Sequence, residues 1–176
     1  EREDLLYAGT ELGMYISFNG GDDWQPFQNN LPIVPITDLE IRQNDLVAAT
    51  QGRAFWVLDD LSPMQQLNDE VANAEYHLYR PGLSYQVDGS QGDNPHEGTN
   101  PPTGSLIYYN FKEKPDTSET TVRLDILNSD NEVIRTYAVG NDEKFDHQNK
   151  NGDNFEGLSI SEGMNRLVWD YQTSEL

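Results

Sequence analysis

The sequence predicts an all-β fold, arranged as two small β units. Short apolar runs alternate with turns rich in Gly, Asn and Asp along most of the chain, and one hairpin-like pattern recurs about 40 residues later. The chain has 176 residues, of which 35% are hydrophobic, a content that suits two modest cores better than one large core.

Charge and composition exclude several classes of partner. With 11 basic and 31 acidic residues, the net charge is -20, which repels nucleic acid and anionic membranes. No apolar run approaches the roughly 18 to 20 residues of a membrane span. Cysteine is absent, so the chain has no disulfides, and composition leaves the compartment open. Because the chain starts at Glu1 without a methionine and leads directly into a predicted strand, we expect a fragment of a longer protein.

The first elements form a predicted hairpin. Residues 5–10 and 14–18 are rich in β-formers and are separated by a turn at 11–13. A polar turn with two glycines follows, and Trp24 restarts the apolar pattern, so residues 24–27 are predicted as an outer strand.

The same pattern returns 40 residues later. Aligning residues 6–18 with 46–58 gives three identities and two conservative pairs: Leu6 with Leu46, Ala8 with Ala48, Thr10 with Thr50, Tyr15 with Phe55 and Phe18 with Leu58. A period near 40 with four short strands per unit is typical of propeller blades, which need neighbours on both faces. Two blades alone do not close a ring.

Further elements complete the first half. In residues 36–41, the side chains of Thr37, Leu39 and Ile41 are predicted to share one face of an inner strand. Ser62 is predicted to cap a short helix that runs through residue 67, with Pro63 at its first position. Residues 77–80 and 83–87 are predicted as strands that leave the blade.

The second half has its own strands after a polar segment. Residues 88–103 lack periodicity and are interpreted as a linker, which divides the chain into domains 1–87 and 104–176. Four strands are predicted beyond the linker, at 105–111, 120–127, 132–137 and 163–170. Val122, Leu124 and Ile126 are predicted to share one face of the second strand, and Leu167 and Trp169 one face of the fourth. These strands favour a small sandwich.

Residues 17–24 resemble the Asp-box of BNR-type β-propellers. Ser17, Asn19, Gly21 and Trp24 stand at its four defining positions, with Asn in place of the usual Asp. The box and the runs at 52–56 and 58–60 make the first half similar to the end of a sortilin-like propeller, of the secreted bacterial kind that is called glycosyl-hydrolase-like. The resemblance implies a secreted or cell-surface bacterial protein, a full ring of blades, and a structural role for the box.

The second half resembles the immunoglobulin-like modules of flagellar hook-capping proteins and of the C-termini of secreted bacterial proteins. A hairpin around a polar turn and a late Asn-x-x-x-Trp-Asp strand, Asn165 to Asp170, carry this resemblance. It implies a small immunoglobulin-like β-sandwich over 104–176.

The resemblance to propellers also implies a candidate binding face, formed by the loops on the side opposite the box. By the 40-residue register, the turns around Glu11 and around Gln51 and Arg53 are equivalent, and if they lie on this face, we expect Asn29 and Asn30 to join them. Arg53 could clamp a carboxylate, although an Arg that braces a blade edge is the more common case.

Other chemistry-bearing residues have structural interpretations. Asp59 and Asp60 are adjacent and fall at a turn, which places them poorly as the two carboxylates of a glycosidase. The tryptophans could stack on sugars but are more often core residues. The acidic 142–156 loop lacks calcium-loop spacing and is interpreted as solvated, with calcium binding left open. The three scattered histidines favour no metal site, and no cofactor motif is present.

The leading hypothesis is a non-catalytic protein- or glycan-interaction region of a larger secreted propeller protein. The alternative is the C-terminal tail of a propeller glycoside hydrolase whose catalytic carboxylates lie in upstream blades. The sequence does not determine the ligand, the number of blades in the larger protein or the oligomeric state.

Overall fold

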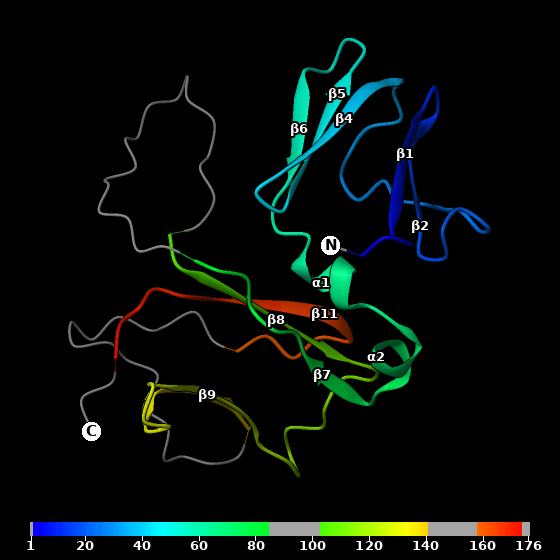
Figure 1. Ribbon diagram of the computed structural model, residues 1–176. Helices are drawn as coiled ribbons and strands as arrows, with labels where there is room; N and C mark the ends of the chain where they lie inside the picture. Colours follow the sequence, from blue (N-terminus) through cyan, green and yellow to red (C-terminus); the bar gives the residue numbers. More distant parts are fainter. Residues whose placement is uncertain (1, 85–102, 141–157, 174–176) are drawn as a thin grey trace. The chain divides into compact units, whose positions relative to one another are not determined.

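A computed structural model describes residues 2–84, 103–140 and 158–173, and it confirms the all-β class (Figure 1). The described residues form eleven strands and two helices of five residues each. The chain divides into two compact units, residues 1–67 (unit 1) and 68–176 (unit 2). No described helix is long and apolar enough to cross a membrane.

Unit 1 begins with a three-stranded antiparallel sheet. Strands β1 (Leu6–Thr10) and β2 (Gly13–Ser17) form the predicted hairpin, and the short β3 (Gln25–Pro26) pairs with the other side of β2. The order is therefore β1-β2-β3.

A second sheet repeats this hairpin with one difference. Its strands are β4 (Ile36–Arg42), β5 (Asp45–Thr50) and β6 (Phe55–Leu58), in the order β4-β5-β6. Ala8 lies opposite Tyr15, and Ala48 lies opposite Trp56. The equivalent of Tyr15 is thus Trp56 and not Phe55, because the turn between β5 and β6 holds one residue more than the turn between β1 and β2. The 40-residue register is right for the first strand of the hairpin and wrong by one residue for the second.

A bulge changes the predicted inner strand β4. Ile36 pairs with Thr50 and Asp38 pairs with Ala49, which leaves Thr37 as the extra residue. Ile36 is buried and Leu39 packs beside it, whereas Thr37 and Ile41 are exposed. The prediction is therefore wrong for Thr37, because the extra residue reverses the alternation there, and right for Leu39 and Ile41, which pair with Ala48 and Leu46 on one face of the sheet.

One apolar cluster joins the two sheets of unit 1. Buried side chains from β2, β4, β5 and the connecting segments form it: Met14, Leu31, Ile36, Leu46, Ala48 and Leu61. The α1 helix (Ser62–Gln66) follows β6 at the place where the repeat would put a fourth strand. Its N-cap residue is Leu61 and not Ser62; the Ser62 hydroxyl instead donates to Asp60 Oδ1.

Unit 2 contains a three-stranded sheet and a separate hairpin. Helix α2 (Asp69–Asn73) leads into β7 (Tyr76–Leu78), and the sheet has the order β11-β8-β7 with β8 (Ser105–Phe111) in the centre and β11 (Gly163–Trp169) at the other edge. The strands β9 (Val122–Leu127) and β10 (Val133–Val139) form the predicted hairpin.

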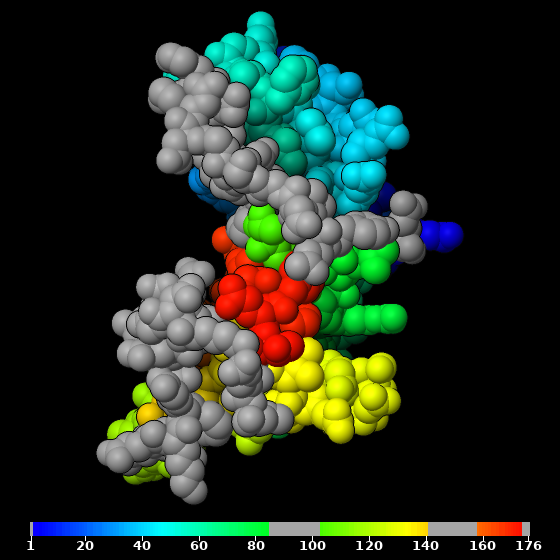
Figure 2. All heavy atoms as spheres, turned by 90° about the vertical axis from the view of Figure 1, so that its left-hand side faces the viewer, coloured from blue at the N-terminus to red at the C-terminus, as the bar shows by residue number. Residues whose placement is uncertain are grey.

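Side chains from the sheet and from the hairpin of unit 2 share one core. The cluster consists of Ile107, Tyr109, Leu124, Tyr137, Leu158 and Leu167. Atoms of β10 (yellow) lie beside the residues at the end of β11 (red) in Figure 2, in agreement with the electrostatic influence of Asp170 on Tyr137. The predicted shared faces of β9 and β11 contribute to this core.

Strand pairing assigns residues 76–78 differently from the sequence. The predicted domain boundary at 88–103 placed these residues in the first half of the chain. In the structure, β7 pairs with β8, with Tyr76 opposite Phe111, and both strands belong to unit 2. Leu83 and Ser84 are not in a strand, and the rest of the predicted 83–87 strand and nearly all of the 88–103 linker lie outside the described residues.

Candidate functional site

The predicted Asp-box residues form a turn whose polar atoms bond to one another. The Ser17 hydroxyl, 1% exposed, accepts the Gly21 N–H at 2.9 Å and donates to Asn19 Oδ1 at 2.9 Å. Asn19 Oδ1 also accepts the Asp23 N–H at 2.9 Å. Because these groups satisfy each other, the turn is held by its own side chains, as an Asx-type turn is.

Asp23 explains why asparagine stands where the box usually has aspartate. The Asn19 amide nitrogen donates to Asp23 Oδ2 at 2.9 Å. A carboxylate at position 19 would instead face the Asp23 carboxylate with no proton between them. An amide can therefore both accept from the Ser17 hydroxyl and donate to the Asp23 carboxylate, which a carboxylate at position 19 could not.

The tryptophan of the box covers the turn and stays partly open to solvent. Trp24 Nε1 donates to the Gly21 carbonyl at 3.0 Å, and the Trp24 ring and the Leu6 side chain both lie beside Gly21. It is 43% exposed, whereas Trp56 and Trp169 are partly buried against the two cores. Trp24 is thus the tryptophan with the most ring surface available.

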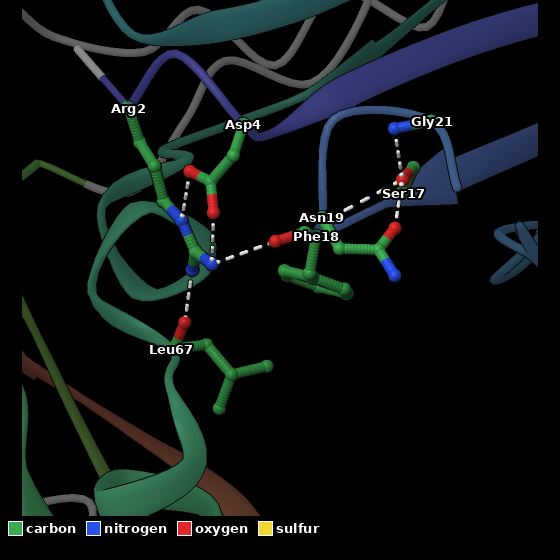
Figure 3. A network of polar contacts seen from close by, with 7 residues as sticks. All are labelled: Arg2, Asp4, Ser17, Phe18, Asn19, Gly21 and Leu67. Atoms are coloured by element: carbon green, nitrogen blue, oxygen red, sulfur yellow. Dashed lines mark hydrogen bonds and ion pairs between the residues drawn. The ribbon is translucent and has the colours of Figure 1, made fainter. Parts of the chain in front are cut away.

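Arg2 ties the box turn to the end of unit 1, and the sequence interpretation missed it (Figure 3). Its guanidinium donates to both carboxylate oxygens of Asp4, at 2.7 and 2.9 Å, to the Phe18 carbonyl at 2.9 Å and to the Leu67 carbonyl. The hydrogen bond from Arg2 lowers the pKa of Asp4. An Arg two residues before an Asp in a polar terminus carries no signal that would have indicated these contacts.

The two loops of the candidate binding face are built alike. Thr10 Oγ1 donates to the Gly13 carbonyl at 2.9 Å, and the equivalent Thr50 Oγ1 donates to the Ala54 carbonyl at 2.6 Å. Both hydroxyls also accept a backbone N–H within their turn, from Leu12 at 3.1 Å and from Arg53 at 3.1 Å. The threonine that occurs in both copies of the repeat therefore has the same structural role in each turn.

These turns present exposed side chains. Glu11, Gln51 and Arg53 are all exposed, and no acid among the described residues forms an ion pair with Arg53. The Arg53 carbonyl accepts the Trp56 indole N–H at 2.9 Å, which fixes the backbone of the turn.

Asn29 and Asn30 line a small hollow that does not include the other three candidate residues. The hollow has a volume of about 50 Å³, and Trp56 and Leu58 also line it. Gln28 holds the loop: its amide accepts the Met14 N–H and donates to the carbonyls of Leu31 and Pro32. A sugar or drug-sized ligand needs roughly 300 Å³ or more, so this hollow suits water or a small side chain.

Asp60 serves the turn after β6. Its Oδ1 accepts from the Asn44 amide at 2.7 Å and from the Ser62 N–H at 3.0 Å, and its backbone lies in the left-handed region at φ 58°. A carboxylate so occupied is poorly placed to exchange a proton with a sugar.

Metal-ligand groups do not gather in the described ranges. No cluster of three or more His, Cys, Asp or Glu residues suited to a metal occurs among them. The His77 ring packs edge-on against Tyr79 at 4.8 Å between centroids. His96, His147 and the whole of the acidic 142–156 loop lie outside the described residues.

No protein-family model matches this chain, and comparisons with curated proteins and with solved structures also found no match.

Proposed function

We propose that residues 1–67 are two blades of an Asp-box β-propeller in a larger secreted protein, and that the chain is a non-catalytic region that binds a protein or glycan. Unit 2 in this proposal is a small immunoglobulin-like sandwich. The secreted location rests on the resemblance of the box and its flanking runs.

The observation that carries the proposal is the outer face of the β4-β5-β6 sheet. The opposite face of this sheet packs into the core of unit 1. On the outer face, Phe55 is 75% exposed and Val57 is 54% exposed, next to Ala49 and Val47 on the neighbouring strand. A sheet with apolar side chains on both faces is expected where another sheet covers it, as in a ring of blades.

Two further features support a binding role without turnover. The carboxylate of Asp60 is engaged in a turn, which places it poorly for proton transfer to a sugar. The exposed loops with Glu11, Gln51 and Arg53 offer charged and amide groups that can bind a ligand from the surface.

Cysteine labelling tests the blade assignment, because this chain has no cysteine of its own. Phe55→Cys and Val57→Cys should react rapidly with a maleimide in the 176-residue chain and at least about tenfold more slowly in the larger protein, where a neighbouring blade covers them. Leu12→Cys, at a turn where the native side chain is 70% exposed, is the matched control and should react equally fast in both. Equal labelling of all three positions in both proteins would contradict the proposal.

Binding without turnover is tested separately. A glycan array and a displayed peptide library should yield ligands for the larger protein, with binding weakened by Arg53→Ala and with no release of reducing sugar. Sugar release that is lost when acids upstream of residue 1 are substituted would favour the hydrolase alternative instead.

A further inference from the structure

The β7 strand leaves one side of its backbone unpaired within the described part of the chain. The Tyr79 N–H donates to the Tyr108 carbonyl at 3.0 Å, and the Lys112 N–H donates to the Glu75 carbonyl at 2.9 Å. Bonded pairs alternate along an antiparallel ladder, so residues 75, 77 and 79 face β8. The N–H and C=O groups of Tyr76 and Leu78 therefore point away from β8, toward an edge with which no described strand pairs.

The same two residues expose large apolar side chains. Tyr76 is 74% exposed and Leu78 is 57% exposed. Natural edge strands are commonly protected by charged side chains, proline or a covering segment. Neither of these two positions carries a charge or a proline, so β7 combines a backbone edge that no described strand covers with an apolar surface.

A hollow lies beside this edge, between the sheet and the hairpin of unit 2. Its volume is about 260 Å³, and residues of β7, β8 and β9 line it together with Leu158, whereas β10 does not. Figure 1 shows β7 as the outer strand of its sheet.

We propose that β7 binds an extended peptide as an added β-strand, with one apolar side chain of the peptide in this hollow and with basic residues flanking it. Backbone bonds to Tyr76 and Leu78 supply affinity, and the hollow selects the side chain that points inward. The net charge of -20 favours a basic segment over a second copy of this chain, which it repels.

This inference does not rest on the blade proposal, since every contact it uses lies in unit 2. Failure of the labelling experiment at Phe55 and Val57 leaves it unchanged, and its own failure leaves the blade proposal unchanged.

The probe is a fluorescent peptide of about nine residues in which Leu and Val alternate with Thr and a Lys pair stands at each end. Fluorescence anisotropy with the full 176-residue chain should show saturable binding below about 1 mM. Methylating the amide nitrogens that face β7 should weaken binding about tenfold or more, whereas methylating the alternate amides should change it less than about threefold.

Two variants locate the site on β7. Leu78→Pro removes an edge N–H that β8 does not use, and Tyr76→Lys places a charge at the hollow; each should weaken binding about tenfold or more. Met164→Lys is the control, because the native side chain is 43% exposed on β11 at the opposite edge of the same sheet. Circular dichroism and thermal unfolding verify that each variant keeps its strand content.

Binding that responds to both β7 variants and to the choice of methylated amides supports the inference. The inference is overturned if the probe does not bind below about 1 mM, if it binds the β7 variants as tightly as the unaltered chain, or if both methylation patterns weaken binding equally. Concentration-dependent dimerisation that Leu78→Pro abolishes would also overturn it, by showing that a second copy occupies the edge.

Discussion

At the scale of single residues, Asn19 shows how a small departure from a motif follows from its surroundings. Its oxygen accepts from Ser17 and from the Asp23 backbone, and its nitrogen donates to the Asp23 carboxylate. The motif alone predicts the turn, but the identity of residue 19 depends on the charge at residue 23.

We therefore expect Asn19→Asp to destabilise unit 1 by about 1 kcal/mol at pH 7, because it places two carboxylates in contact. Adding Asp23→Asn should restore most of that loss, since an amide at position 23 can donate to the new carboxylate. Urea unfolding of the single and double variants measures both effects. A single variant as stable as the unaltered chain would show that the Asn19 to Asp23 bond has no influence on stability.

At the scale of secondary-structure elements, the approach of β1 to β4 sets the spacing of the two sheets in unit 1. A Cβ built at Gly9 would lie 2.6 Å from Ile36 Cγ2 and 2.8 Å from Ile36 Cβ. Because Ile36 is buried and β-branched, it has little freedom to move away.

Gly9→Ala is expected to cost about 1 to 3 kcal/mol of unfolding free energy, as overpacking does. Ile36→Ala should cost about 2 to 5 kcal/mol by leaving a cavity. The double variant should lose less than the sum, because removing Cγ2 relieves part of the overlap. Chemical unfolding of all three variants checks this, and additive losses would mean that the two residues do not limit each other.

Local signals predicted turns more successfully than caps. The threonine repeated at positions 10 and 50 marks two turns that are built in the same way. Helix α2 was not predicted, although Asn68 accepts the Val71 N–H as N-cap and two acids follow it. That signal is present in the sequence, but a helix of five residues has no apolar period to draw attention to it.

At the scale of the whole molecule, each unit has its own core, with a tyrosine in or against it. Burial raises the pKa of Tyr7 to about 12 in unit 1 and that of Tyr109 to about 12 in unit 2. The Tyr109 hydroxyl donates to the Ser159 carbonyl at 2.8 Å, whereas the Tyr7 hydroxyl has no partner among the described residues.

Both units should lose stability as the pH rises from about 10 to about 12. In this window the unfolded tyrosines release their protons near pH 10, while the folded ones retain theirs, so the unfolded state binds fewer protons and gains relative to the native state. Below pH 10 the tyrosines are protonated in both the folded and the unfolded state, so their full contribution to the stability of the folded state is present.

Tyr7→Phe should reduce the alkaline loss in unit 1 and cost little or nothing at pH 8, because it removes a buried hydroxyl without a described partner. Tyr109→Phe should cost about 1 kcal/mol at pH 8 by losing a hydrogen bond. The stability of each unit is measured by urea unfolding followed by tryptophan fluorescence. Variants that keep only Trp56 report unit 1, and variants that keep only Trp169 report unit 2. An identical alkaline loss in unit 1 with and without Tyr7 would refute the assignment.

The sequence by itself determined the β class, the two hairpins of unit 1, the box turn and the strands of the late hairpin, because each depends on residues close together in the chain. Only the tertiary structure decided that β7 pairs with β8, that a bulge at Thr37 turns Ile36 inward, and that the second hairpin turn is one residue longer. The physical reason is that alternation shows which residues can share a face, but not which distant strand supplies the partner or where an extra residue is accommodated.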